Sequence, residues 1–152
     1  MNAAEEGKTR LKSFTFRTAA AWTEARSGIL TSDGKPPIRV SSPPEFKGEP
    51  GLWTPEEMFV SSVEACHMAT FLSFAAKSRL QVLAYKSHSN GVLEFVDGDY
   101  RFTRVVIFPT IAVARGAVEA EVLSLLREAQ KHCLVANSID SIVEVNPTII
   151  QQ

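Results

Sequence analysis

The feature that most constrains the fold of this chain is a long apolar helix, predicted from about Pro55 to Ser78. Thr54 can cap its N-terminus, Pro55 suits the first helical position, and Glu56 and Glu57 complement the positive end of the helix dipole. One face then repeats at three- and four-residue steps, through Phe59, Val63, Cys66, Thr70 and Phe74, and is widened by Ala65, Ala69, Leu72 and Ala76. So broad an apolar surface predicts a central, mostly buried helix.

Strands are predicted before and after this helix. Upstream, Ser13–Arg17 alternates as a strand, and the turn at Ser32-Asp33-Gly34 predicts a hairpin whose second arm includes Ile38 and Val40. Downstream, alternating segments predict a hairpin or a three-stranded meander; they are Val82–Ser87, Val92–Val96 and Tyr100–Phe108, with Pro109 ending the last or marking an edge.

A second helix is predicted over roughly Ala117–His132, followed by a last strand around Ile142–Val145. The order of strands, long helix, strands, helix and strand indicates an α+β fold rather than regular βαβ units. We expect one domain over residues 1–152, with residues 1–12 frayed. The stretch from Ser41 to Gly51, rich in Pro and Gly, is predicted to be a loop.

Composition excludes several classes of protein. Hydrophobic residues make up 45% and charged residues 22% of the chain, which is typical of a soluble globular domain. With 16 basic and 17 acidic residues the net charge is −1, so we expect no nucleic-acid binding. The polar start lacks the apolar core of a signal peptide, and no uninterrupted apolar run approaches about 20 residues. We therefore expect a cytoplasmic protein that does not associate with membranes.

The chain has only two cysteines, Cys66 and Cys133, and each lies on the apolar side of a predicted helix. In a reducing cytosol such a pair indicates either buried core residues or transient redox chemistry. Polar residues near the two thiols keep the redox interpretation open; they are Glu56, Glu57, Glu64, His67 and His132. Adjacent residues on a helix point about 100° apart, so Cys66-His67 and His132-Cys133 do not predict a metal site.

Two motifs resemble the OsmC/Ohr family, which comprises osmotically inducible and organic hydroperoxide resistance proteins. Thr54–Phe59 followed by Val60–Cys66 is similar to the family helix that carries the first cysteine. Ala129–Ser138 is similar to the end of the family's second long helix, which carries the other cysteine. The loop Ser41–Gly51 also resembles the one that precedes the first helix. The sequence departs from the pattern at His67, where peroxidases often carry an apolar residue, and at Leu134, where a proline is common.

The resemblance implies an intertwined homodimer, in which antiparallel sheets wrap around two long central helices. It also implies a stress-response peroxidase that reduces organic hydroperoxides or hydrogen peroxide. Cys66 would be the peroxidatic thiolate, Cys133 the resolving thiol and Glu56 the acidic partner of a catalytic arginine. Arg26 is the best counterpart of that arginine, and Arg17 and Arg39 remain open. No cofactor is implied; a dithiol, such as a lipoyl protein or a thioredoxin-like donor, would be the reductant.

The spacing of Glu56 and Cys66 limits how they can cooperate. Ten residues separate them (66 − 56), which is about 15 Å along a helix. If both serve one site, a long arginine must bridge them or Glu56 must come from the other subunit, so we expect a site at the dimer interface. An apolar rim could accept the organic part of a hydroperoxide, with core or dimer packing as the alternative role of the same residues: Phe59, Met58, Trp53 and Phe46.

Two other functions fit the same residues. One is a non-catalytic OsmC-like dimer that binds a small apolar or thiol ligand. The other is a redox sensor whose cysteines oxidise under stress and signal to a partner.

Overall fold

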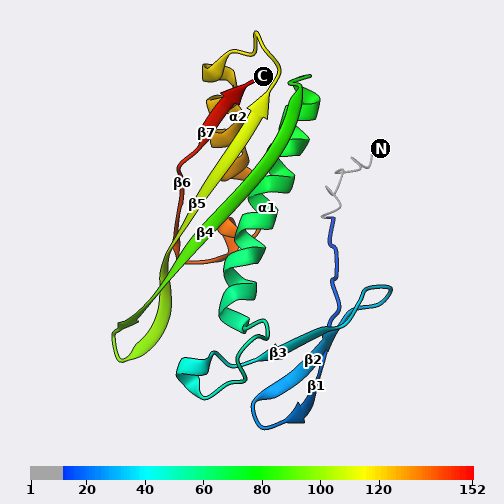
Figure 1. Ribbon diagram of the computed structural model, residues 1–152, viewed down its shortest axis with the longest axis vertical. Coiled ribbons are helices and arrows are strands. Elements are labelled where there is room, and N and C mark those ends of the chain that lie inside the picture. Colours follow the sequence, from blue (N-terminus) through cyan, green and yellow to red (C-terminus); the bar gives the residue numbers. More distant parts are fainter. Residues whose placement is uncertain (1–11) are drawn as a thin grey trace, which may run out of the picture. The chain divides into compact units, whose positions relative to one another are not determined.

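A computed structural model describes residues 12–152, so all of the segment predicted to be frayed, except Lys12, lies outside the described residues. The chain divides into two compact units, Met1–Trp53 and Thr54–Gln152. Figure 1 labels the helices and strands of both units.

The first unit is a three-stranded antiparallel sheet. Its strands β1 (Ala19–Glu24), β2 (Ser27–Thr31) and β3 (Ile38–Ser41) follow one another in the order β1-β2-β3. The predicted hairpin is confirmed, because the Lys35 N–H donates to the Ser32 carbonyl at 3.1 Å and closes the turn between β2 and β3. The loop rich in Pro and Gly contains a short 3-10 helix, η1 (Pro44–Phe46).

The strand predicted at Ser13–Arg17 is wrong. These residues join no sheet among the described strands, and Phe14 and Phe16 are 80% and 91% exposed. An alternating pattern forms a strand only where another strand accepts its backbone hydrogen bonds, and none does so within residues 12–152.

The second unit packs two helices against a sheet. Its helices are α1 (Pro55–Lys77) and α2 (Glu119–His132), with a 3-10 turn η2 (Ala136–Ser138) after α2. The sheet contains β4 (Val82–Val96), β5 (Asp99–Val113), β6 (Ile142–Val145) and β7 (Thr148–Gln151). Strands β4 and β5 form the long hairpin of Figure 1, and β6 and β7 pair with successive parts of β5. The α+β class is confirmed.

The antiparallel pairing expected of the sheets holds for the first sheet and for β4 with β5, but not for the whole second sheet. Strands β6 and β7 both run parallel to β5, so the second sheet is mixed. A parallel pair requires a crossover between its strands, and α2 supplies it between β5 and β6. This crossover returns the chain past α1, which is how the two cysteine-bearing segments come to lie together.

The β4–β5 region is a hairpin and not a meander. Strand β4 continues through Asn90 and Gly91, where the sequence predicts a break. A Cβ at Gly91 would lie 2.3 Å from Val60 Cγ2, so glycine permits α1 to approach the strand closely. Pro109 does not end β5 but lies between the stretch paired with β6 and the stretch paired with β7, where its missing N–H disrupts neither ladder.

Two apolar clusters hold the second unit together. The larger joins α1, β5 and α2 through buried side chains, namely Phe71, Ala75, Ile111, Val113, Val122, Leu126 and Ala129. The smaller places Val63 of α1 against Val105 and Ile107 of β5. The clusters fix both helices on the sheet and thereby fix the position of the cysteines.

Candidate functional site

Helix α1 carries Cys66 and begins where the sequence predicts. The Glu57 N–H donates to Thr54 Oγ1 at 3.1 Å, and the Thr54 N–H donates to Glu57 Oε2 at 3.0 Å, which completes a reciprocal capping box. Pro55 occupies the first turn, where no backbone N–H is needed. The start of the helix is therefore locked, and this sets the rotation that turns Cys66 toward the end of α2.

Cys133 lies at the C-terminal end of α2. The inner face of this helix repeats through Val122, Leu126 and Ala129, and Cys133 continues it at the next four-residue step. The thiol is buried, with 1% of the residue exposed, whereas Cys66 is only partly buried. The chain then turns sharply through η2, which brings the backbone of residues 134 and 135 next to Cys66.

The two thiols are reduced and in contact. No disulfide joins them, and the Cys133 side chain lies within hydrogen-bonding reach of the Cys66 sulfur. The structure thus brings together the two cysteines that the sequence predicts to cooperate, although they are not at disulfide distance. The segments that carry the two cysteines would have to come closer before a bond could form.

The surroundings of Cys66 favour its thiolate. Burial raises the pKa of this thiol, but hydrogen bonds from the Val135 N–H, the Cys133 thiol, the Leu134 N–H and Thr70 together lower it below its ordinary value. The Thr70 hydroxyl has a single proton, which it donates to the Cys66 carbonyl at 2.8 Å, so we assign the effect mainly to the other donors. A thiolate is the form of cysteine that attacks electrophiles.

The surroundings of Cys133 favour its neutral thiol. Burial raises the pKa of Cys133, and the neighbouring Cys66 raises it further, because the thiol donates to the Cys66 sulfur and a second negative charge would be repelled. The N–H groups of Ala136 and Val135 act in the opposite direction without reversing the shift. Cys66 therefore ionises before Cys133, and once one proton is lost the remaining proton stays on Cys133.

Glu56 lies in the first turn of α1, on the same uninterrupted helix as Cys66. Ten residues of α-helix span about 15 Å, so this carboxylate does not touch the Cys66 thiol of its own helix. Its Oε2 is buried and has no hydrogen-bond partner among the described residues. A buried carboxylate oxygen with no partner is costly, and this makes Glu56 a candidate to receive a cation.

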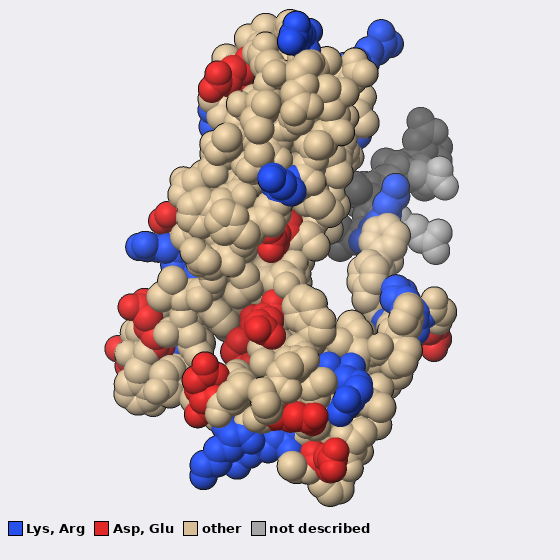
Figure 2. Space-filling view, viewed as in Figure 1, with Lys and Arg blue, Asp and Glu red and all other residues tan. Residues whose placement is uncertain are grey.

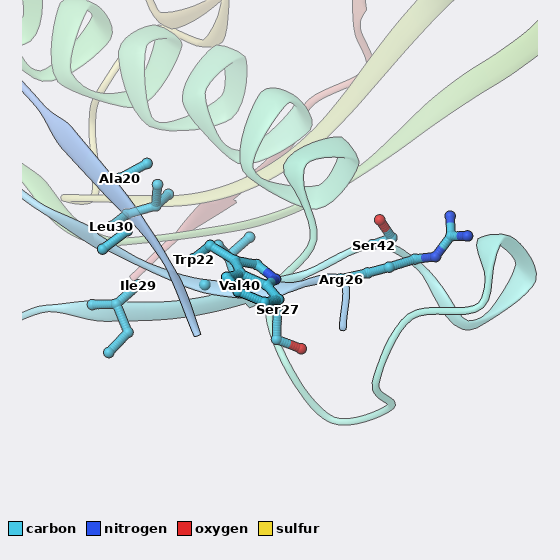
Figure 3. A pocket seen from close by; sticks show the side chains of 10 residues that line it. Ala20, Trp22, Arg26, Ser27, Ile29, Leu30, Val40 and Ser42 are labelled. Atoms are coloured by element: carbon cyan, nitrogen blue, oxygen red, sulfur yellow. The ribbon is translucent and has the colours of Figure 1, made fainter. Parts of the chain in front are cut away.

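The three candidate arginines belong to the first unit. Arg26 follows Ala25 in the tight β1–β2 turn, where Ala25 has a φ of 43°. It lies at one end of an open hollow of about 420 Å³ on the three-stranded sheet, beside Ser27 and Ser42 (Figure 3). Arg39 pairs with Glu49 at 3.6 Å, whereas Arg26 forms no ion pair with any residue that the structure describes.

The four residues predicted to form a substrate rim fall into both units. Phe59 stacks on Phe102 with ring centroids 4.6 Å apart and packs on the smaller apolar cluster, so it has a clear packing role. Met58, next to it on α1, is partly buried. In the first unit Trp53 and Phe46 are exposed, and Trp53 forms an isolated parallel bridge with Val40.

His67 is more deeply buried than the sequence suggests. It faces α2 with 1% of its surface exposed, and neither ring nitrogen makes a well-formed hydrogen bond in the part of the chain that the structure describes. Burial lowers the pKa of His67, and the nearby Leu126 backbone only partly offsets this effect. The imidazole is therefore neutral at physiological pH. Within residues 12–152 no three His, Cys, Asp or Glu side chains gather to hold a metal ion.

Sequence reasoning missed the groups that stabilise the Cys66 thiolate within the second unit. The N–H groups of Leu134 and Val135 belong to the backbone, so no residue type announces them. The resemblance of residues 129–138 to the family motif indicates that this segment contributes to the site. Only the fold shows that its backbone lies near the Cys66 sulfur.

Comparisons with known proteins agree with this architecture. The family model described as OsmC-like protein matches residues 48–148. An OsmC-like protein of unknown function from Vibrio cholerae has a similar structure, with a TM-score of 0.83, 24% identity, and coverage of 89% of this chain and 99% of the other.

Two solved structures with assigned names share the fold at lower identity. An organic hydroperoxide resistance protein from Elizabethkingia anophelis has a TM-score of 0.73 and 19% identity, covering 93% of this chain and 99% of that one. The organic hydroperoxide resistance protein from Bacillus subtilis has a TM-score of 0.62 and 17% identity, and the match covers 90% of this chain and 98% of that one. Among curated proteins, none matches the sequence.

Proposed function

Because this chain belongs to the OsmC-like protein family, we propose that it is a thiol peroxidase that reduces organic hydroperoxides or hydrogen peroxide. The contact between two thiols with opposite pKa shifts carries the proposal. Cys66 ionises first and is the nucleophile, while Cys133 keeps its proton and is the resolving thiol. Two structural neighbours named as organic hydroperoxide resistance proteins support the substrate class.

The proposed reaction has three balanced steps. The Cys66 thiolate attacks the distal peroxide oxygen, the O–O bond breaks, and the leaving alkoxide takes a proton to give an alcohol, leaving a sulfenic acid on Cys66. The Cys133 thiol then displaces water from that sulfenic acid and forms the Cys66–Cys133 disulfide. A dithiol donor reduces this bond by exchange and is itself oxidised to a disulfide. We propose a lipoyl protein or a thioredoxin-like protein as the donor and the cytoplasm as the location.

We further propose that Arg26 and Glu56 complete the site. An arginine beside Cys66 would favour its thiolate, and a carboxylate can hold a guanidinium through two parallel hydrogen bonds. The buried, unpartnered Oε2 of Glu56 supports this role, because such an oxygen calls for a cation. Arg39 is the weaker candidate, since it already pairs with Glu49.

A homodimer is part of the proposal, because α1 leaves an uncharged stripe exposed. The stripe follows helical spacing through Ser62, Ala65, Ala69, Leu72, Ser73 and Ala76. Only 22% of the helix's most apolar window is buried, and by length and composition alone α1 could even span a membrane. Small side chains favour close helix packing, so a second copy of α1 is the cover we propose. Cys66, four residues after Ser62 and three before Ala69, borders this stripe.

The dimer would also bring charge and apolar surface to the thiols. Figure 2 shows acidic and basic side chains interspersed on the face in view. We propose that Met58, Phe59, Trp53 and Phe46 contribute the apolar rim for the organic group of a hydroperoxide. Trp53 and Phe46 are exposed and Met58 and Phe59 only partly buried, which supports this role, although Phe59 also packs on Phe102.

Stopped-flow mixing of the reduced protein with an alkyl hydroperoxide tests the function. We expect rapid loss of both thiols, abolished by Cys66→Ser, and a persistent sulfenic acid in Cys133→Ser. Reaction no faster than that of free cysteine would exclude the enzyme and leave a ligand-binding dimer. Disulfide formation without turnover in excess dithiol would identify a redox sensor instead.

The dimer has its own test. Light scattering of the wild type should give twice the chain mass of 16.7 kDa, and Ala69→Glu should shift it toward the monomer with loss of peroxidase activity. Ala120→Glu is the matched control, because it places the same charge on an exposed alanine of the other helix, α2, outside the stripe. A monomer with full peroxidase activity would overturn the interface site.

A further inference from the structure

Strand β4 turns a row of hydroxyl groups toward α1, which lies beside it in the second unit (Figure 1). The Tyr85 ring packs on Phe71 of α1, with ring centroids 6.0 Å apart. Two residues further along the strand, Ser87 Oγ donates to Glu64 Oε1 of α1 at 2.5 Å. Alternate residues of a strand lie on the same face, so Ser89 faces α1 as well.

Two hydroxyls of this row are buried without a partner. The Tyr85 hydroxyl and Ser89 Oγ make no well-formed hydrogen bond with any residue in the range 12–152. The neighbouring strand supplies none, because the β5 residues paired with the row are apolar and buried, namely Ile111, Pro109 and Ile107. Buried hydroxyls in native proteins almost always have a partner, so this row calls for a bound ligand between α1 and β4.

Glu64 gives the row a negative charge. The short bond from Ser87 has the length of an O–H donor to an ionised carboxylate. No lysine or arginine of the described chain forms an ion pair with Glu64, and the residue is only partly buried, so an ion can reach it from solvent. Burial raises the pKa of Tyr85, the nearby Ser87 partly offsets this, and the charge of Glu64 raises it again, which agrees with a hydroxyl close to the carboxylate.

We propose that Glu64, Tyr85, Ser87 and Ser89 form a binding site for a monovalent metal cation, Na⁺ or K⁺. The site offers oxygen atoms only, which hard cations prefer, and a single carboxylate balances a single positive charge. Protein sites for Ca²⁺ carry more carboxylates than this one. Two residues turn a helix by about 200°, so Glu64 lies on the side of α1 away from Cys66. The cation site is therefore independent of the thiols and of the proposed peroxidase activity.

Two measurements on the full chain test the site. Sodium NMR should show a line broadened by the protein, and thermal unfolding should respond as NaCl or KCl replaces choline chloride at fixed total chloride. We expect the melting temperature to rise by about 3–6 °C at a cation concentration tenfold above the dissociation constant. Glu64→Gln should abolish both effects, whereas Glu121→Gln, at an exposed glutamate of α2, is the matched control and should retain them. Equal melting temperatures in sodium, potassium and choline would overturn the proposal and leave ordered water as the partner of the hydroxyls.

Tyr85→Phe and Ser89→Ala keep the proposal testable if Glu64→Gln does not fold. Each removes a hydroxyl that has no well-formed hydrogen bond in the described part of the chain, and phenylalanine keeps the ring beside Phe71. Without a ligand, these changes should leave the protein as stable as the wild type or more stable. With the cation bound, each should raise its dissociation constant roughly threefold to tenfold. Unchanged cation affinity in both variants would reject the site.

Discussion

The Cys133 thiol lies within hydrogen-bonding reach of the Cys66 sulfur, and this one contact shifts the two residues in opposite directions. It lowers the pKa of Cys66, because a donated proton stabilises the thiolate. It raises the pKa of Cys133, because losing that proton would place two negative sulfurs side by side. Two chemically identical side chains thereby differ in acidity, and the roles proposed for them, nucleophile and proton-bearing partner, follow from that difference.

The first prediction is that Cys66 reacts ahead of Cys133 and depends on it for ionisation. With limiting iodoacetamide at neutral pH, peptide mass spectrometry should find the label on Cys66. Cys133→Ala removes the donor and should raise the Cys66 pKa by about one unit. Cys133→Ser retains a hydroxyl donor and should shift the pKa less. Preferential labelling of Cys133 would contradict this ordering.

The second prediction concerns His67 and stability in acid. Burial lowers the pKa of His67 in the folded protein, so the unfolded chain binds the proton more readily. The stabilising effect of a neutral His67 is complete above the unfolded pKa near 6.5 and is lost as pH falls from there toward the folded pKa. Within that window the free energy of unfolding should fall by up to about 1.4 kcal/mol per pH unit.

His67→Leu is the variant that isolates this effect. Leucine is similar in size and leaves no orphaned nitrogen, so at pH 7 we expect stability to be unchanged or raised by about 1 kcal/mol. Urea unfolding between pH 7 and pH 5 should show a shallower pH dependence than the wild type. A variant with the same slope as the wild type would assign the acid sensitivity to other groups.

Local signals predicted the helices well, whereas contacts between distant segments escaped prediction. Thr54, Pro55 and Glu57 act within one turn, so the start of α1 could be read directly from the sequence. The role of Gly91 depends on Val60, thirty-one residues away, and the parallel placement of β6 depends on a helical crossover. Neither leaves a local mark, and the sequence alone therefore predicts a break between strands at Gly91.

The candidate site shows the same division. Both cysteines and Glu56 could be named as candidates from motif and helix position, because the chemistry proposed for them resides in their side chains. The donors from Leu134 and Val135 could not, because every residue except proline carries the same N–H. The burial of His67 also went unpredicted, since its covering surface comes from α2.

The third prediction tests the close approach of α1 and β4 at Gly91. A Cβ there would lie 2.3 Å from Val60 Cγ2 and 2.9 Å from Phe102 Cε1, so Gly91→Ala must displace stiff side chains. We expect a loss of about 1–3 kcal/mol in the free energy of unfolding, typical of overpacking. Urea denaturation measures it.

A double-mutant cycle distinguishes crowding from a backbone effect at Gly91. Val60→Ala removes the nearest methyl group and should recover part of the loss when combined with Gly91→Ala. Strictly additive losses in the double variant would show that the two positions do not crowd each other, contrary to the close approach described above.

The fourth prediction concerns the capping box that fixes the start of α1. Thr54→Ala leaves the Glu57 N–H without its acceptor and should lower the free energy of unfolding by about 1 kcal/mol. Thr54→Ser keeps the oxygen and should retain most of the stability. Both are measured by the urea midpoint at constant slope.

The serine variant is the control that isolates the capping hydrogen bond. Thr54 is buried, so the alanine variant loses a methyl contact as well as the hydroxyl, whereas the serine variant loses only the methyl. If alanine and serine destabilise the protein equally, the capping hydrogen bond contributes nothing, and the rotation of α1 that presents Cys66 must be fixed by the apolar clusters alone.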